Sequence, residues 1–385
     1  MRGALLFFFY AQVHRPCTGK VDNHSMKATL ILENGIEFHG ESIGSTDEVI
    51  CEMVFNTSMV GYQEILTDPS YAGQGIVMTY PLIGNYGVNE EDDESAHPWT
   101  KALVVRHLAP RGSNFRCTST LNDYLIRNGI TGIQDIDTRY LTRILRKEGV
   151  MNGAITCDEH YDKAALLEKL HAYRVESAVA QVTCREIQHI PGKGGRVALY
   201  DFGEKRNMVA RLVHYGCDVT IFPAFTPAEE VLSGGFDAIM LSNGPGDPAD
   251  CADIIREVRK LYDSGMPIFG VCLGHQLMAL ATGASTYKMG FGHRGGNHPV
   301  KDVRRGRCFI TSQNHGYVVD GASIDPAVAQ VSHVNVNDGS VEGLLYLQKP
   351  VFTVQFHPEA SPGPVDTDYL FADFMALIRK SKEEK

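Results

Sequence analysis

From residue 197 to residue 282 the sequence alternates between short apolar runs and segments with helical spacing, and this alternation constrains the fold more than any other feature. The apolar runs predict strands at 197–201, 218–222, 238–242 and 268–271. The intervening segments predict helices at 207–215, 227–232, 251–264 and 273–282. Such alternation is typical of a mostly parallel sheet with helices on both faces. The C-terminal half is therefore predicted to be an α/β domain, completed by short strands after Gly283 and a helix from about residue 366.

The N-terminal half has a different pattern. Polarity alternates on both sides of Asn34-Gly35, a pair favoured in two-residue hairpin turns. Further strands are predicted at 50–56, 75–80 and 102–105, and helices at 121–128 and 138–147. Asp137 or Thr138 is a suitable N-cap for the last helix. Its basic residues, Arg139, Arg143, Arg146 and Lys147, leave a solvated face and an interface both open. Strands that precede the helices favour an α+β domain.

The length of 385 residues exceeds what one ordinary core accommodates, so two domains are expected. Between residues 173 and 195 the periodicity decays, and PGKGG at 191–195 is typical of a loop. We therefore expect an N-terminal domain at 26–175, a linker at 176–194 and a C-terminal domain at 195–385.

Residues 1–25 precede the first folded pattern and are expected to be a tail, or sequence translated upstream of a start at Met26. Their apolar run ALLFFFYA follows Arg2 and resembles part of a signal peptide. It is too short to span a bilayer, which needs about 20 residues.

Charge and cysteine content exclude several classes of function. Lys and Arg total 36 and Asp and Glu total 46, and the resulting net charge of −10 argues against nucleic acid as a partner. The nine cysteines are odd in number and form no C-x-x-C pair, so neither a disulfide framework nor a zinc site is expected. Free thiols fit the reducing cytoplasm, and no membrane partner is expected. Small molecules or another protein remain as partners.

The segment GVCLG at 270–274 lies between a predicted strand and a predicted helix. This order matches the nucleophile elbow of hydrolases, with cysteine in place of serine. At the start of a helix, unpaired amides and the helix dipole favour the thiolate, the reactive form of cysteine. A free cysteine is, however, more often a small buried side chain. Local sequence therefore leaves two roles open for Cys272, nucleophile or buried thiol.

A nucleophilic thiol needs a base, and a candidate pair follows the strand predicted at 351–356. His357 and Glu359 stand two residues apart, so both side chains can face the same way and the carboxylate can orient the imidazole. A lone histidine is more often a satisfied surface or core side chain, and this interpretation stays open for His357. The competing histidines are His275, His293, His298 and His315.

The loop SNGPGDP at 242–248 leaves the predicted strand that precedes the cysteine strand. A rigid loop of this kind can offer backbone N–H groups of Gly244 or Gly246 to an oxyanion, together with the amide of Leu273. The same residue types also occur in ordinary strand-to-helix connections. The loop by itself therefore leaves both interpretations open.

Taken together, LSNGPGDP, GVCLGHQLMALATGA and FHPEASPGP resemble the class I glutamine amidotransferase family. The segments FNTSMVGYQEILTDPSYAGQ, YPLIGNYG and DIDTRYLTRILRKEG resemble the N-terminal domain of the carbamoyl phosphate synthetase small subunit family. YDFGEKRNM, FGHRGGNHPV and TSQNHGYVVD resemble its amidotransferase half. The resemblance extends from Met26 nearly to the last residue.

The resemblance implies that Cys272 is the nucleophile, His357 the general acid and base, and Glu359 its orienting carboxylate. The L-glutamine site that it implies consists of Ser58, Gly244, Gly246, Leu273, Gln276, Asn314, Gly316 and Tyr317. At position 317, relatives commonly have phenylalanine, and tyrosine keeps the ring and the backbone. We therefore expect little effect of Tyr317 on specificity.

The resemblance also implies a reaction and a partner. Cys272 forms a thioester with L-glutamine and releases ammonia, which a large subunit uses with bicarbonate and two ATP to make carbamoyl phosphate for arginine and pyrimidine biosynthesis. ATP, bicarbonate and a metal ion are expected on that subunit, in a heterodimer or a higher oligomer, and no cofactor is expected in this chain. The sequence contains no G-x-x-x-x-G-K-[ST] loop, in agreement. The alternatives are a stand-alone cysteine hydrolase and a catalytically silent subunit that stabilises its partner.

Overall fold

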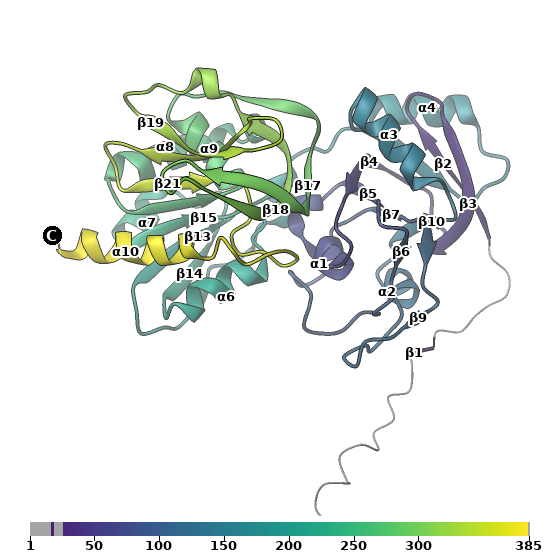
Figure 1. Ribbon diagram of the computed structural model, residues 1–385, viewed down its shortest axis with the longest axis horizontal. Helices are drawn as coiled ribbons and strands as arrows, with labels where there is room; N and C mark the ends of the chain where they lie inside the picture. The colour runs from purple at the N-terminus through teal and green to yellow at the C-terminus, as the bar shows by residue number, and fades with distance from the viewer. Residues whose placement is uncertain (1–16, 19–25, 384–385) are drawn as a thin grey trace, which may run out of the picture.

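The computed structural model describes residues 17–18 and 26–383, which form two domains side by side (Figure 1). The predicted tail at 1–25 lies outside the described residues except for Cys17 and Thr18, whose backbone forms a two-residue strand paired with the segment Arg111–Gly112. Within the described ranges, no helix has the length and apolar character that crossing a membrane requires.

Seven strands of the N-terminal domain close into a barrel in the order β10-β3-β2-β11-β4-β5-β7. These strands are β2 (Lys27–Leu32), β3 (Glu37–Gly44), β4 (Val49–Asn56), β5 (Gln74–Met78), β7 (Ala102–Val104), β10 (Thr131–Gln134) and β11 (Met151–Thr156). The hairpin predicted at Asn34-Gly35 is confirmed by the antiparallel pairing of β2 with β3. Closure of the barrel was not predicted, because β10 and β11 lie beyond the strands that the pattern revealed and pair with strands far away in the sequence.

Four α-helices and several short elements accompany the barrel. They are β1 (Cys17–Thr18), α1 (Tyr62–Thr67), η1 (Pro69–Tyr71), β6 (Leu82–Ile83), β8 (His107–Leu108), β9 (Arg111–Gly112), α2 (Leu121–Arg127), α3 (Thr138–Glu148) and α4 (Lys163–Ala172). Asp137 is the N-cap of α3 and accepts a hydrogen bond from the Tyr140 backbone N–H at 2.9 Å. On the same helix, the Arg146 guanidinium lies over the ring of Phe291 in the C-terminal domain, so part of the basic face is an interface within the chain.

The C-terminal domain is built on one ten-stranded sheet in the order β12-β14-β13-β15-β16-β21-β20-β19-β17-β18. Its strands are β12 (Gln188–Ile190), β13 (Arg196–Asp201), β14 (Asp218–Pro223), β15 (Ala238–Leu241), β16 (Ile268–Val271), β17 (Thr286–Asp302), β18 (Arg307–Val319), β19 (Ala329–Asn335), β20 (Val341–Tyr346) and β21 (Val351–Val354). From β14 through β13, β15 and β16 to β21 the pairings are parallel. The strands beyond β21 are antiparallel, as is the edge strand β12.

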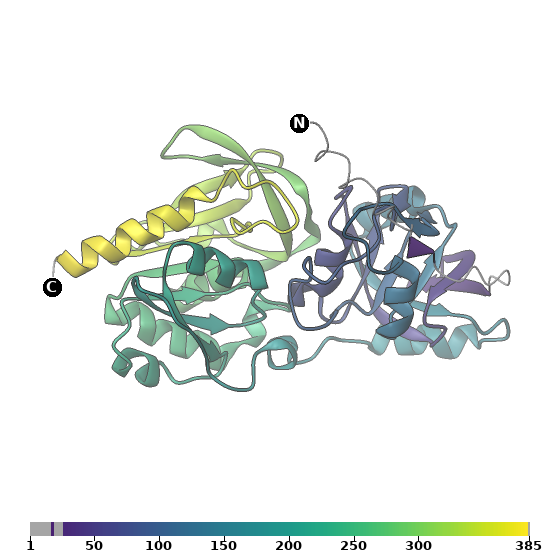
Figure 2. The same cartoon turned by 90° about the horizontal axis from the view of Figure 1, so that it is seen from below.

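Helices cover both faces of this sheet (Figures 1 and 2). The helical elements are α5 (Ala178–Val182), α6 (Arg206–His214), α7 (Ala228–Ser233), η2 (Pro248–Asp250), α8 (Ala252–Ser264), α9 (Leu273–Ala281), η3 (Gly321–Ser323) and α10 (Tyr369–Glu383). Side chains of α7, α8 and α9 share one apolar core, and those of α6 and α10 share the other. Phe269 in the sheet packs on Phe371 and Phe374 of α10, and all three are fully buried. Burying each such side chain contributes about 1.5–3 kcal/mol.

Three expectations differ from the structure. The sheet is not mostly parallel, because four of its nine pairings are parallel, and β12 together with the strands that follow Gly283 adds five antiparallel ones. The strands after Gly283 are not all short, because β17 has 17 residues and β18 has 13. Their pairing contains irregularities between Lys288 and His293 and between Gly295 and His298, which interrupt the alternation of polarity without ending the strand. The segment 176–194, expected to be a linker, contains α5 and β12, and β12 forms an edge of the sheet.

Candidate active site

Cys272 lies at the sharp turn between β16 and α9. Its backbone has φ 52° and ψ −103°, a conformation that non-glycine residues rarely adopt and that costs about 1–3 kcal/mol. Its N–H donates to the Val354 carbonyl of the neighbouring strand at 2.9 Å, which helps to hold this conformation. A Cβ at Gly274 would lie 2.4 Å from the Leu241 carbonyl oxygen, so only glycine lets the helix begin this close to the sheet. The sequence therefore folds locally so that a cysteine stands at the N-terminus of a buried helix.

The Cys272 side chain is buried, with 2% of its surface exposed, and polar groups surround its sulfur. Sγ is 3.6 Å from the Asn314 carbonyl oxygen, to which the thiol donates. The side-chain Nε2 of Gln355 donates to the same sulfur at 3.6 Å. The thiol also raises the pKa of the nearby His357, whose Nε2 is buried and has no hydrogen-bond partner among the described residues.

His357 and Glu359 form a buried pair in which Nδ1 of the imidazole lies 2.6 Å from Oε1 of the carboxylate. Lys205 Nζ contacts the same oxygen at 2.9 Å, and its side chain is 3% exposed. Burial lowers the pKa of His357, but the Glu359 charge opposes this and the pKa rises overall, to about 10. Burial raises the pKa of Glu359, but Lys205 and His357 together lower it, to about 2. The pair is therefore an imidazolium and a carboxylate near neutral pH.

The loop after β15 packs directly against the start of α9. The Ser242 carbonyl accepts a hydrogen bond from the Gly274 backbone N–H at 2.9 Å. A Cβ at Gly244 would lie 2.2 Å from the Phe202 carbonyl oxygen, so this position requires glycine. Asn243 fastens the loop to the N-terminal domain, because its Nδ2 donates to the Ser70 hydroxyl at 2.9 Å. The loop is thus held rigidly beside the first turn of α9, whose backbone N–H groups have no partners within the helix.

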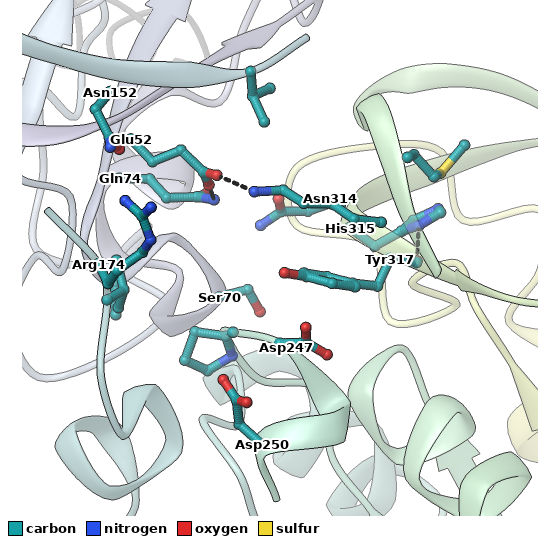
Figure 3. A pocket seen from close by; sticks show the side chains of 18 of the residues that line it. Glu52, Ser70, Gln74, Asn152, Arg174, Asp247, Asp250, Asn314, His315 and Tyr317 are labelled. Carbon is teal, nitrogen blue, oxygen red and sulfur yellow. Dashed lines mark hydrogen bonds and ion pairs between the residues drawn. The ribbon is translucent and has the colours of Figure 1, made fainter. Parts of the chain in front are cut away.

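A cavity of about 940 Å³ opens at Cys272, between the two domains. Figure 3 shows Glu52, Gln74 and Ser70 on the N-terminal side, and Asp247 and Tyr317 on the C-terminal side. Most of the predicted glutamine-site residues line this cavity with the cysteine: Gly244, Gly246, Gln276, Asn314, Gly316 and Tyr317. The fold thus brings together three segments that are apart in the sequence, at 244–246, 272–276 and 314–317.

Ser58 and Leu273 are not among the cavity-lining residues. The Ser58 hydroxyl accepts a hydrogen bond from the Gly296 backbone N–H at 3.2 Å, so it lies at the contact between the domains. The Leu273 side chain is 1% exposed and belongs to an apolar core. A role of Leu273 through its backbone amide is compatible with this position.

The orientation of Gln276 is determined by its partners. Its Nε2 donates to the Tyr317 carbonyl oxygen at 2.8 Å and to Oε1 of Gln355 at 3.0 Å. Both amide protons are thereby used, and the side-chain oxygen remains as an acceptor at the cavity. Asn314 is oriented by Asp68 of the N-terminal domain, whose Oδ2 accepts from Nδ2 at 3.0 Å. Burial raises the pKa of the Tyr317 hydroxyl, and its contact with Asp247 adds to the shift.

The competing histidines are engaged elsewhere. Nδ1 of His275 lies 2.8 Å from the Thr353 hydroxyl, and burial lowers the pKa of His275 to about 3. Burial lowers the pKa of His298 to about 4 and that of His315 well below its usual range. None of these three has a carboxylate partner of the kind that His357 has in Glu359, and His357 alone of the four has its pKa raised by the Cys272 thiol.

His293, His315 and Glu342 each place a ligand atom within 4.8 Å of the others, a set of the kind that binds zinc. Each group already has a hydrogen-bonding partner. His293 Nε2 lies 2.8 Å from Asp338 Oδ2, His315 Nε2 lies 2.8 Å from Gln313 Oε1, and Glu342 accepts from Gln313 Nε2 at 2.9 Å. An ion is therefore not required to satisfy them.

Two residues near the reacting groups were not predicted, Lys205 and Gln355. Lys205 stands in YDFGEKRNM, a segment that carries the family resemblance, and Gln355 directly precedes another such segment, FHPEASPGP. Lys205 contacts Glu359, and Gln355 contacts Cys272. In both pairs the partner is far away in the sequence. The ion pair of Lys205 joins it to a carboxylate far along the chain, and no local sequence pattern predicts such a contact.

Comparison of the chain with known proteins shows the family to which it belongs. The model of the carbamoyl-phosphate synthase small chain CPSase domain matches residues 30–155, and that of class I glutamine amidotransferase matches residues 198–377. The carbamoyl phosphate synthase small chain of Clostridium perfringens is 50% identical over 350 residues, which cover 91% of this chain and 99% of the relative. That of Escherichia coli K12 is 48% identical over 376 residues, covering 92% and 98%. The pyrimidine-specific small chain of Bacillus subtilis is 47% identical over 360 residues, covering 93% and 98%. The chain belongs to the carbamoyl phosphate synthase small chain family.

Proposed function

We propose that this chain is the glutaminase subunit of a carbamoyl phosphate synthase, with Cys272 as nucleophile, His357 as general acid and base, and Glu359 as the carboxylate that orients His357. The observation that carries the proposal is that Cys272 lines the cavity between the domains and that a buried imidazolium–carboxylate pair lies close enough for the thiol to affect the pKa of His357. An imidazolium beside a thiol favours the thiolate, the nucleophilic form. Family membership supports the same activity.

In the first half of the reaction, the Cys272 thiolate attacks the side-chain amide carbon of L-glutamine. The developing oxyanion is held by backbone N–H groups of Gly244 and Leu273, which are fixed before the substrate arrives. His357 then donates its proton to the amide nitrogen, and the C–N bond breaks to release ammonia. A γ-glutamyl thioester and a neutral imidazole remain.

In the second half, the neutral imidazole takes a proton from water, and the hydroxide attacks the thioester carbonyl. The C–S bond breaks, the thiolate of Cys272 is regenerated, and glutamic acid leaves and loses its proton to solvent. The imidazolium is restored at the same time. Glu359 and Lys205 keep the ring orientation and charge balance through both halves.

The glutamine site is proposed to hold the substrate along the cavity wall. The side-chain oxygen of Gln276 is a suitable acceptor for the α-ammonium group, because both its amide protons are already used. Asn314, Gly316 and Tyr317 form the facing edge, and Gly246 and Ser58 complete the set carried over from the family. The Ser58 hydroxyl is proposed to act at the contact between the domains.

The ammonia is proposed to pass to a large subunit, in a heterodimer or a higher oligomer. That subunit is proposed to hold ATP, bicarbonate and a metal ion and to make carbamoyl phosphate for arginine and pyrimidine biosynthesis. The relatives named as small chains support such a partner. A cytoplasmic location is supported by free thiols in the described part of the chain, at Cys51, Cys157, Cys184, Cys217, Cys251, Cys272 and Cys308.

The test is Cys272→Ala in the complex reconstituted with a carbamoyl phosphate synthase large subunit. Glutamine-dependent synthesis is expected to be lost and ammonia-dependent synthesis to be retained, because only the nitrogen source changes. Cys308→Ala, at an exposed cysteine, is the matched control and is expected to keep both activities. An unchanged glutamine-dependent rate in Cys272→Ala would contradict the proposal. Glutaminase activity that does not rise when the large subunit is added would favour a stand-alone hydrolase.

A further inference from the structure

Gln355 follows β21 and is completely buried next to the reacting sulfur. Its backbone N–H donates to the Glu342 carbonyl of the adjacent strand at 2.9 Å, which fixes its position. Its side chain lies between two groups of the candidate active site. Nε2 donates to Cys272 Sγ at 3.6 Å, and Oε1 accepts from Gln276 Nε2 at 3.0 Å.

The orientation of the Gln355 amide follows from a chain of partners. The Tyr317 carbonyl oxygen only accepts hydrogen bonds, so the side chain of Gln276 must turn its NH₂ group toward it. The second proton of that NH₂ group points at Gln355, which must therefore present its oxygen. The NH₂ group of Gln355 is left facing the sulfur. The Tyr317 carbonyl oxygen thus determines that the NH₂ group of Gln355, and not its oxygen, faces the Cys272 sulfur.

The donor matters most when the sulfur is ionised. As a thiol, Cys272 donates to the Asn314 carbonyl oxygen. As a thiolate it has no proton to donate and needs donors, which Gln355 supplies together with His357. The charged groups that face the sulfur are His357, with Glu359 and Lys205 behind it, and Arg294 from β17. Gln355 adds a neutral donor to these charged groups, and its own protonation state does not change with pH.

We propose that Gln355 is a further catalytic residue, whose side-chain amide donates a hydrogen bond to the Cys272 thiolate in an orientation set by Gln276 and the Tyr317 carbonyl. This inference rests on the proposed function, since it concerns the same nucleophile. The hydrogen bond increases the fraction of thiolate before attack. It also stabilises the thiolate as it leaves when the thioester is hydrolysed.

The test uses Gln355→Met, which removes the donor and keeps a similar side-chain volume. The readout is the midpoint pH for alkylation of Cys272 by iodoacetamide in the full complex, followed by peptide mass spectrometry because other thiols also react. Loss of the donor is expected to raise this midpoint by about one pH unit or more and to lower the glutamine-dependent kcat by about tenfold. The KM for glutamine is expected to rise as well, because Gln276 loses a partner.

Gln313→Met is the matched control, since this buried glutamine bonds to Glu342 and His315 instead of the sulfur. It is expected to leave the alkylation midpoint unchanged. Gln355→Asn keeps a buried amide that is one methylene too short to bridge Gln276 and the sulfur, and it is expected to shift the midpoint upward. It serves as the deciding variant where Gln355→Met no longer shows the urea-unfolding transition of the wild-type chain, which reports on folding.

A midpoint within about 0.2 pH unit of the wild type in both Gln355 variants would overturn the proposal, as would an equal shift in Gln313→Met. The measurement does not depend on glutamine turnover. Failure of the proposed function would instead be seen as glutamine-dependent synthesis by Cys272→Ala, so the two failures are distinguishable.

Discussion

Lys205 Nζ lies 2.9 Å from Glu359 Oε1, and neither side chain is appreciably exposed. The lysine also donates to the Ala360 and Ser361 carbonyl oxygens, so its charge is held in one place. Glu359 has a second cationic partner, because His357 Nδ1 contacts the same oxygen. Two buried cations thus share one carboxylate, and the orientation of the proposed acid and base depends on both of them.

Lys205→Met is expected to impair glutamine use specifically. Without the lysine, Glu359 keeps one partner and the ring of His357 is held less firmly. We expect a fall in glutamine-dependent kcat of about 10-fold to 100-fold, part of the contribution of about 10²–10⁴ that general acid–base catalysis makes. Breaking a buried ion pair also costs about 3–5 kcal/mol of stability. Steady-state rates with glutamine and with ammonia, together with urea unfolding, measure the two effects. Lys193→Met, at an exposed lysine, is the control, and an unaltered glutamine rate in Lys205→Met would contradict the assigned role.

Gly274→Ala is expected to disturb the cysteine turn. The added Cβ would meet the Leu241 carbonyl oxygen at 2.4 Å, and a backbone atom cannot swing aside as a flexible side chain does. We expect a loss of about 1–3 kcal/mol in the free energy of unfolding and a larger relative loss of glutamine hydrolysis, because Cys272 moves with the turn. Urea unfolding and glutaminase assays measure these. Gly290→Ala is the control, since a Cβ there meets nothing within 4 Å, and equal behaviour of the two variants would refute the explanation.

Tyr317→Phe is expected to have a small effect. The substitution removes the hydroxyl that contacts Asp247 but keeps the ring and the carbonyl oxygen that accepts from Gln276. The loss of one hydrogen bond that is not fully buried corresponds to about 0.5–1.5 kcal/mol, so the KM for glutamine is expected to change by about tenfold at most. Gln276→Leu, which removes the donor to that carbonyl, is expected to raise KM more. A larger effect of Tyr317→Phe than of Gln276→Leu would show that the hydroxyl contacts the substrate.

Glu204→Gln is expected to stabilise the protein at alkaline pH. Burial raises the pKa of Glu204 to about 8, with Asp201 and Glu94 adding to the shift, and one of its oxygens has no hydrogen-bond partner among the described residues. The folded protein therefore holds a proton that the unfolded chain, with a pKa of 4.5, releases. The stability that this proton contributes is complete below pH 4.5 and is lost as the pH rises toward 8.

We accordingly expect the free energy of unfolding of Glu204→Gln to exceed that of the wild type by about 1–3 kcal/mol at about pH 8.5. At about pH 5 the two free energies are expected to differ little. Urea unfolding at the two pH values measures the difference. Glu186→Gln, at an exposed glutamate, is expected to show no such pH dependence. A benefit of Glu204→Gln that is the same at both pH values would mean that ionisation of Glu204 is not its cause.

The sequence by itself determined the elements whose order is local. Strands and helices of the α/β region lie within one or two residues of their predicted ends, for example α7 at Ala228–Ser233 and β16 at Ile268–Val271. Periodicity and turn residues suffice there because each element is decided by its own neighbours. Short motifs and the family resemblance predicted Cys272, His357 and Glu359 as site residues, and the structure pairs His357 with Glu359 near Cys272.

Only the tertiary structure decided what depends on contacts between distant segments. Closure of the N-terminal barrel, the length of β17 and the place of β12 at the sheet edge follow from strand pairing, which periodicity does not report. The same holds for Lys205 and Gln355, whose roles arise from a carboxylate and a sulfur across the fold. Burial makes these contacts strong, because an ion pair or an amide proton has no water to replace its partner. The sequence predicted the nucleophile, and the folded chain decided which groups surround Cys272.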